Sequence, residues 1–203
     1  MATEVVNGLE PRPDGLYLDC TVGAGGHSRA LLEAGGGRVL GLDRDPEAFP
    51  FARVALASWA DRVKLLHADF REIEQVLDEH GITTVDGAVA DLGVSSMQLE
   101  MQGRGFSFRR DEVLDMRMDR TQGPTAAELL RDVPEQILAN LIFQYGEERY
   151  SRRIARAIVT ERQREPFETT AQLATLIRRV VPTRYRRRID PATRTFQALR
   201  IWV

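Results

Sequence analysis

Residues 16–91 alternate short apolar runs with helix-like segments, and this alternation constrains the fold more than any other feature of the chain. Four buried strands are predicted, at Leu16–Asp19, Arg38–Asp43, Val63–His67 and Val85–Asp91. Between them the sequence predicts helices over Ser28–Glu33, from Pro46 to about residue 60, and over Glu72–His80 with Gly81 as C-cap. Strands that are apolar throughout and alternate with helices form a parallel, doubly wound sheet. The sequence therefore predicts an α/β fold.

The pattern changes after Ser96. Residues 97–123 are rich in Gly, Arg, Asp and Met and predict an irregular loop. From Thr125 onward the chain is predicted to be helical, with capping-box spacing at Thr125–Glu128 and Thr169–Gln172. We therefore predict an α/β domain over residues 1–103 and an all-helical domain over residues 104–198.

Charge is distributed unevenly along the chain. Residues 1–149 hold 15 basic and 26 acidic side chains, whereas residues 150–203 hold 13 arginines and four acidic side chains. A basic segment of this kind suits a polyanion such as RNA, although an arginine-favouring genome would also inflate the count. The chain has a single cysteine, no secretory signal and no apolar run long enough for a membrane span, so a cytoplasmic protein without membrane contact is expected.

The loop after the first predicted strand reads DCTVGAGGHS over residues 19–28. Glycines in such a loop let the backbone approach a ligand closely. Ser28 occupies the third glycine position of the G-x-G-x-x-G dinucleotide motif, and Asp19 would repel a pyrophosphate. Asp19 could instead bind the ammonium group of S-adenosylmethionine. We interpret Asp19, Gly23, Gly25 and Gly26 as part of a cofactor site, the alternative being a plain strand-to-helix turn capped by Asp19.

The other predicted strands also end near aspartates. Asp43 is placed to accept hydrogen bonds from both ribose hydroxyls of an adenosine cofactor, unless it only caps the next helix. Asp69 and Phe70 follow the third strand, where Phe70 could pack on adenine or equally in the core. Asp91 ends the fourth strand. Because ligands bind beyond the carboxyl ends of parallel strands, four aspartates at one edge indicate a site.

Seven segments together closely resemble the bacterial small-subunit ribosomal RNA cytosine-N4 methyltransferases of the MraW or RsmH type. These segments are DCTVGAGGHS, GLDRDP, DGAVADLGVSS, RGFSF, LDMRMD, GEERYSRRIARAIV and PATRTFQALRIWV. The resemblance implies a class I S-adenosylmethionine-dependent methyltransferase fold, Rossmann-like, with an inserted helical domain. It implies methylation of N4 of a cytidine in the decoding region of 16S ribosomal RNA, in the small ribosomal subunit.

The same resemblance implies roles for individual residues. Gly25, Gly26 and His27 would line the cofactor loop, and Asp43 would bind the ribose. The remaining contacts to the cofactor would come from Phe70, Asp91 and Gln98. Family members also continue past TFQALRIWV with further strands, so residues 199–203 are predicted to begin the return to the first domain. A chain that stops at Val203 is expected to be a truncated copy with weak activity or none.

Transfer to a cytosine amine requires positioning rather than a strong base, because the N4 lone pair is delocalised into the ring. Asp91 is the predicted acceptor for the N4 hydrogens, and Ser95 is a weaker candidate. Amino-group methyltransferases often carry Asp-Pro-Pro-Tyr or a close variant at this place. This chain has Asp-Leu-Gly-Val-Ser-Ser at residues 91–96, with no aromatic residue to stack on the base. No cluster of Cys and His ligands is visible in the sequence, so no metal is expected.

Several residues after position 103 are predicted RNA contacts. Phe106 or Phe108 could stack on the base, or could pack beneath the loop. Arg117 could contact RNA, or could pair internally with Asp115. The remaining predicted contacts are Arg104 and the run Arg186, Arg187 and Arg188, the latter being either phosphate ligands or part of a solvated loop. The predicted partner is 16S ribosomal RNA in the small subunit, and a homodimer stays open.

Two other functions compete with methyl transfer. A nicotinamide (NAD)-dependent oxidoreductase would use a similar sheet, but Ser28 and Asp19 argue against it. A non-enzymatic RNA-binding module would explain the basic segment but leave the four strand-end aspartates without a role.

Overall fold

In the computed structural model, which describes residues 2–182 and 189–203, the chain divides after Gly93 into two units, residues 1–93 and 94–203. Each unit has its own core. The division lies before the predicted boundary at residue 103. Residues 199–202 form the last turn of helix α10 (Ala192–Trp202), and Leu199 is buried in the helical core.

The first unit is built on a parallel sheet. Among the described residues, β1 (Leu16–Asp19), β2 (Arg38–Asp43), β3 (Val63–His67) and β4 (Gly87–Val89) pair in the order β3-β2-β1-β4. Leu18 pairs with Leu40 of β2 on one side and with Ala88 of β4 on the other. The predicted α/β class is therefore confirmed, and the bounds of the first three strands match the prediction; β4 is shorter than predicted.

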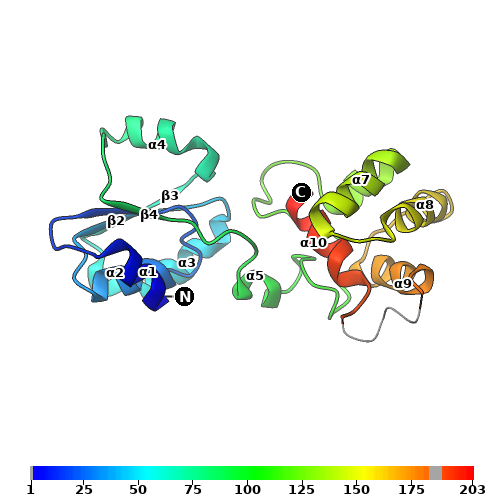
Figure 1. The fold of residues 1–203 in the computed structure, drawn as a ribbon, viewed down its shortest axis with the longest axis horizontal. Coiled ribbons are helices and arrows are strands. Elements are labelled where there is room, and N and C mark those ends of the chain that lie inside the picture. Colours follow the sequence, from blue (N-terminus) through cyan, green and yellow to red (C-terminus); the bar gives the residue numbers. More distant parts are fainter. Residues whose placement is uncertain (1, 183–188) are drawn as a thin grey trace. The chain divides into compact units, whose positions relative to one another are not determined.

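Helices cover both faces of the sheet (Figure 1). One face carries α1 (Ala2–Leu9), α2 (Gly26–Glu33) and α3 (Phe49–Ala55), which bury Tyr17 and Val39. The other face carries α4 (Ile73–Glu79), whose Val76 packs with Leu18 and Leu40. Short 3-10 helices precede or follow these at Pro46–Ala48, Ala57–Trp59 and Phe70–Glu72. The single helix predicted from Pro46 to about residue 60 is thus three consecutive pieces.

Helix α1 was not predicted from the sequence. Its apolar residues Val5, Val6 and Leu9 pack against the core beneath the sheet. A Cβ atom added at Gly87 would lie 2.8 Å from the Leu9 side chain, so the glycine in β4 makes room for this helix. Eight residues are too few for a stable isolated helix, and the packing supplies what local propensity does not.

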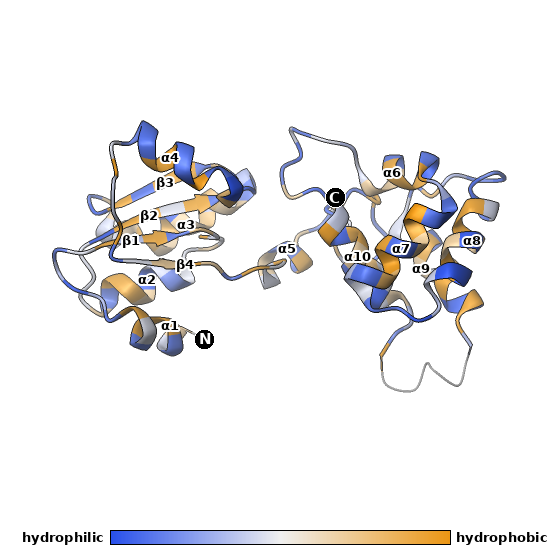
Figure 2. Ribbon diagram, turned by 45° about the horizontal axis from the view of Figure 1, so that its top comes forward, coloured by the Kyte–Doolittle hydropathy of each residue, from blue (hydrophilic) through white to orange (hydrophobic). Residues whose placement is uncertain are grey.

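The second unit is helical. It contains α5 (Ser96–Glu100), α6 (Ala126–Asp132), α7 (Glu135–Gly146), α8 (Ser151–Glu161), α9 (Thr170–Val180) and α10. The predicted capping boxes are both present, with Thr125 and Thr169 accepting from the backbone N–H of Glu128 and Gln172. Figure 2 shows apolar and polar stripes along these helices, and the apolar side chains form one core that includes Leu138, Ile142, Ile154, Ile158, Leu173, Ile177 and Phe196. No helix in residues 2–182 or 189–203 is long and apolar enough to cross a membrane.

Candidate functional site

Asp19 lies at the carboxyl end of β1 and is completely buried. Its Oδ2 accepts a 2.7 Å hydrogen bond from the Ser28 hydroxyl, and its Oδ1 accepts one from the backbone N–H of Thr21. Burial raises the pKa of Asp19, and these hydrogen bonds offset only part of the effect. The predicted contact between Asp19 and a cofactor ammonium group is therefore corrected: Asp19 ties β1 to α2 and presents no surface to a ligand.

Asp43 lies at the carboxyl end of β2, next to β1 in the sheet. Its two oxygens accept the backbone N–H groups of Gly23 at 2.7 Å and Asp45 at 2.8 Å. Burial raises the pKa of Asp43, although these two hydrogen bonds act in the opposite direction. Each oxygen keeps a lone pair for a further donor, such as a ribose hydroxyl. The cap of the following 3-10 helix is Asp45, not Asp43, because Asp45 accepts from the N–H of Glu47.

The glycines between β1 and α2 are required by the backbone. Gly23 has φ +50° and Gly25 has φ +86°, in the left-handed region that favours glycine. A Cβ at Gly25 would also come within 3.2 Å of Leu56, whereas a Cβ at Gly26 would meet nothing within 4 Å. The loop is therefore packed closely against Leu56 at Gly25, whereas Gly26 borders open space.

His27 and Asp91 meet at this edge of the sheet. Nε2 of His27 lies 3.3 Å from Oδ2 of Asp91, and the Asp91 side chain is 49% exposed. The backbone N–H of Asp91 donates to the hydroxyl of Thr21, which holds the end of β4 against the glycine loop. Among the described residues, Nδ1 of His27 is buried without a hydrogen-bond partner. A proton on Nδ1 would be a buried donor lacking an acceptor, so the geometry favours the tautomer that donates from Nε2 to Asp91.

Asp69 and Phe70 follow β3 and differ in accessibility. Asp69 caps the 3-10 helix at Phe70–Glu72 and accepts a bidentate pair of hydrogen bonds from Arg71. These hydrogen bonds lower the pKa of Asp69, and Arg44 adds to the effect from 3.7 Å. Phe70 is 42% exposed. The aromatic ring is thus open to a ligand, while the carboxylate beside it is already held by arginines.

The second unit contains the predicted site residues Ser95 and Gln98. They form a capping box at the start of α5: the Ser95 hydroxyl accepts from the Gln98 N–H, and the Gln98 side chain accepts from the Ser95 N–H. This box was missed because residues 97–123 were predicted to be a loop. The structure gives both residues a local structural role, and their predicted roles in catalysis and cofactor binding stay predictions.

Two predicted RNA contacts lie inside the helical unit. Arg104 is 1% exposed and donates to the carbonyl oxygens of Arg117 and Met118. Phe106 is equally buried, with the Arg104 guanidinium 5.2 Å from its ring centre. Neither side chain has a surface with which to contact RNA, and this part of the prediction is corrected. Phe108 is half-buried and packs edge-on against Phe196.

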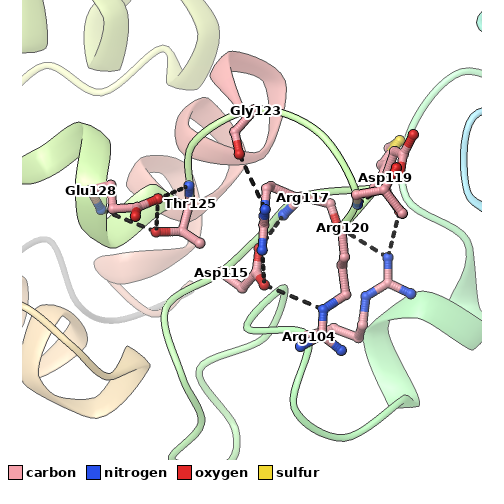
Figure 3. A network of polar contacts seen from close by, with 10 residues as sticks. Arg104, Asp115, Arg117, Asp119, Arg120, Gly123, Thr125 and Glu128 are labelled. Carbon is pink, nitrogen blue, oxygen red and sulfur yellow. Dashed lines mark hydrogen bonds and ion pairs between the residues drawn. The ribbon is translucent and has the colours of Figure 1, made fainter.

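Arg117 belongs to a polar network around a buried carboxylate (Figure 3). Two of its guanidinium nitrogens donate to the two oxygens of Asp115, and a third donates to the carbonyl of Gly123. Arg120 lies 3.4 Å from the same carboxylate. The alternative of an internal Asp115–Arg117 ion pair is therefore the one observed. Arg186, Arg187 and Arg188 lie outside the described residues.

Sequence reasoning missed Thr21 and underrated Ser28. Both are small hydroxyl residues in the glycine loop, and both bind an aspartate of the strand ends. The available signal for Ser28 is the apolar strand that ends in Asp19, because a buried carboxylate needs donors. The Thr21 hydroxyl instead accepts from the backbone of Asp91, 70 residues away, and no local pattern indicates this contact.

Residues 1–203 match the model of the MraW methylase family. The ribosomal RNA small subunit methyltransferase H of Paramagnetospirillum magneticum is 50% identical over 203 residues, which are 100% of this chain and 63% of that protein. The protein of the same name from Rhodospirillum rubrum is 52% identical, over 100% of this chain and 62% of its own length. The chain therefore spans a little under two thirds of these relatives.

A solved structure of NSun6 from Pyrococcus horikoshii is 21% identical, covers 48% of this chain and 24% of that one, and has a TM-score of 0.38.

Proposed function

Because this chain belongs to the MraW methylase family, we propose that it carries the cofactor site and an RNA-binding unit of an S-adenosylmethionine-dependent methyltransferase. The proposed substrate is N4 of a cytidine in the decoding region of 16S ribosomal RNA, within the small ribosomal subunit in the cytoplasm. The observation that carries the proposal is the Asp43 carboxylate, held at the open edge of the sheet by the backbone of the glycine loop.

The residues at this edge fit such a cofactor. Asp43 keeps free lone pairs for two ribose hydroxyls, Phe70 exposes an aromatic face to an adenine ring, and Gly26 leaves open space in front of the loop. When bound, S-adenosylmethionine supplies an electrophilic methyl group on a sulfonium. Asp19 takes no part in binding, and its role is to keep the loop in place through Ser28.

Asp91 is the residue that contacts the amine of the substrate in this proposal. Oδ2 of Asp91 faces Nε2 of His27, which leaves Oδ1 to accept an N–H of the target amine. A carboxylate in this position orients the amine and takes up the proton that N4 loses when it gains a methyl group. Most of the acceleration then comes from positioning, as the delocalised N4 lone pair requires.

The names of the curated relatives support a methyltransferase over the two alternatives. An NAD-dependent oxidoreductase would also use Asp43, but the family match gives it no support. A non-enzymatic RNA-binding module would leave the Asp43 and His27–Asp91 arrangement unused.

Calorimetric titration of this chain with S-adenosylmethionine tests the cofactor site, and we expect one site per chain. Methyl transfer is then measured for the chain joined to the unmatched third of a curated relative. Assembled or partly assembled small subunits should be methylated far faster than free cytidine, and the product should be N4-methylcytidine. Binding of NADH in place of S-adenosylmethionine, or equal rates on free cytidine, would contradict the proposal.

A further inference from the structure

Helix α8 (Ser151–Glu161) carries positive charges at its N-terminal end, where they are unfavourable. Arg152 and Arg153 lie in its first turn, Arg156 lies one turn later, and there is no acidic residue in the first turn. The N-terminal end of a helix dipole disfavours cations, and like charges three or four residues apart repel one another. All three side chains are exposed, while the opposite face of the helix buries Ile154 and Ile158. Stability alone gives no reason for this arrangement.

Neighbouring side chains do little to offset this cost. Arg152 and Arg153 make no hydrogen bond or ion pair with any residue in the described ranges, 2–182 and 189–203. Within the part of the chain that the structure describes, the Arg156 guanidinium contacts one side chain, that of Glu135, at 3.4 Å. Both groups are exposed, and such a pair contributes little stability in water. Of the other nearby acids, Glu148 uses its carboxylate to cap the backbone of Tyr150, and Glu147 is exposed. The exposed face of α8 that carries Arg152, Arg153 and Arg156 therefore holds more positive charge than its neighbouring acidic side chains neutralise.

The first turn of α8 lies at a corner that also exposes an aromatic ring. Helices α7 and α8 pack side by side and are joined by residues 147–150 (Figure 1). The Arg156–Glu135 contact sets the start of α7 beside the middle of α8, so Phe143 near the end of α7 lies toward the first turn of α8. Phe143 is 63% exposed.

Helix α10 contributes a further cation to the same corner. The Arg194 guanidinium donates to the carbonyl oxygen of Glu147, in the connection between α7 and α8. Arg194 is itself exposed. Phe143, Arg152, Arg153 and Arg194 are all exposed, and each lies near the 147–150 connection, by its place in the sequence or through this hydrogen bond. We name these four residues the α7–α8 corner.

We propose that the α7–α8 corner binds RNA, with its arginines on the phosphates and Phe143 on an unpaired base. The inference rests on the proposed function, because it names the surface through which the helical unit holds its RNA. Guanidinium groups form paired hydrogen bonds with phosphate oxygens, and an exposed phenyl ring can stack on an unpaired base. An acidic protein segment would use the arginines but would leave the exposed ring without a specific role.

The test uses an RNA hairpin with a single-stranded loop, and its binding to the chain is measured by fluorescence anisotropy at several salt concentrations. The double variant R152E/R153E should bind at least about tenfold more weakly. Its dependence of log affinity on log salt should be shallower by roughly 1.4–1.8, the value for two lost phosphate contacts. The matched control R53E/R131E makes the same charge change at exposed arginines of α3 and α6 and should bind nearly as the unaltered chain does.

Thermal unfolding separates a lost RNA contact from misfolding. Acidic residues in a first turn favour the helix, so R152E/R153E should unfold at the same temperature as the unaltered chain or higher. Phe143→Ala should weaken binding to the looped hairpin without changing the salt dependence, and Phe143→Trp should retain it.

The outcomes separate this surface from the proposed function. If the unaltered chain binds the hairpin and R152E/R153E binds equally well, the surface is wrong and the proposed function stands. If the unaltered chain binds no RNA even at low salt, both the surface and the RNA substrate are wrong. Tighter binding to polyglutamate than to the hairpin would also overturn the surface.

Discussion

The Ser28 hydroxyl donates a 2.7 Å hydrogen bond to Oδ2 of Asp19, and both side chains are completely buried. This contact joins the end of β1 to the first turn of α2 across the glycine loop. It also explains why the third glycine of the dinucleotide motif is a serine here: a buried carboxylate needs a donor that glycine lacks.

The first prediction follows from this contact. Ser28→Gly restores the G-x-G-x-x-G pattern, yet it should destabilise the first unit by about 1–3 kcal/mol through the lost hydrogen bond, with a further 0.5–1 kcal/mol or so for glycine in a helix. Urea unfolding monitored in the first unit measures the loss. In an Asp19→Asn background the loss should be smaller, since a neutral amide costs less to bury than a carboxylate. An equally stable Ser28→Gly variant would show that the contact has no energetic role.

The second prediction concerns Asp43. Asp43→Ala should weaken S-adenosylmethionine binding by at least about 1–3 kcal/mol, the range for hydrogen bonds to a charged group. Calorimetric titration measures the change, with circular dichroism confirming that the variant is folded. Asp61→Ala, which removes an exposed aspartate at the start of the β3 segment, is the matched control and should bind normally. Unchanged affinity in a folded Asp43→Ala variant would remove Asp43 from the site.

The third prediction concerns the ring of His27. Nitrogen NMR in mildly alkaline buffer should find its proton on Nε2, facing Asp91, with Nδ1 unprotonated. His80 is an internal control of the opposite kind, because its Nδ1 lies 2.9 Å from the Val76 carbonyl, which can only accept. Asp91→Ala should make the His27 tautomers more equal and leave His80 unaffected. A proton on Nδ1 of His27 would contradict the proposed orientation of Asp91.

The fourth prediction is the acid sensitivity of the helical unit. Burial raises the pKa of Asp115, but hydrogen bonds from Arg117 and the charges of Arg117 and Arg120 outweigh it, so the pKa lies below its ordinary value of 3.8. The ionised Asp115 carboxylate therefore stabilises the folded state, and this stabilisation is fully present above pH 3.8, the ordinary value of its pKa. It is lost as the pH falls through the lower pKa of the folded state. The helical unit should therefore lose stability steeply in this acid range.

Thermal unfolding of the chain and of Asp115→Asn, measured from neutral pH to below pH 3.8, tests this acid sensitivity. The variant should be less stable at neutral pH by about 1–3 kcal/mol and should show a flatter acid limb. Glu100→Gln, at the end of α5, serves as a control with one exposed carboxylate removed. Parallel acid limbs for the chain and for Asp115→Asn would exclude Asp115 as the source.

Local patterns in the sequence were enough to predict much of the fold. The bounds of β1, β2 and β3, the parallel sheet and the capping boxes at Thr125 and Thr169 all depend on side-chain periodicity or on contacts within a few residues. The placement of Asp43 and Asp91 at one edge also followed, because parallel strands end on the same side of a sheet.

Only the tertiary structure decided which side chains of these motifs reach the surface. Asp19 and Asp91 both follow apolar strands, yet Asp19 is buried with Ser28 while Asp91 is half-exposed beside His27. Arg104 was predicted to contact RNA, but in the structure it is buried and donates to the carbonyl oxygens of residues 117 and 118. The burial of a side chain depends on neighbours that are distant in the sequence, and a local sequence pattern does not identify those neighbours.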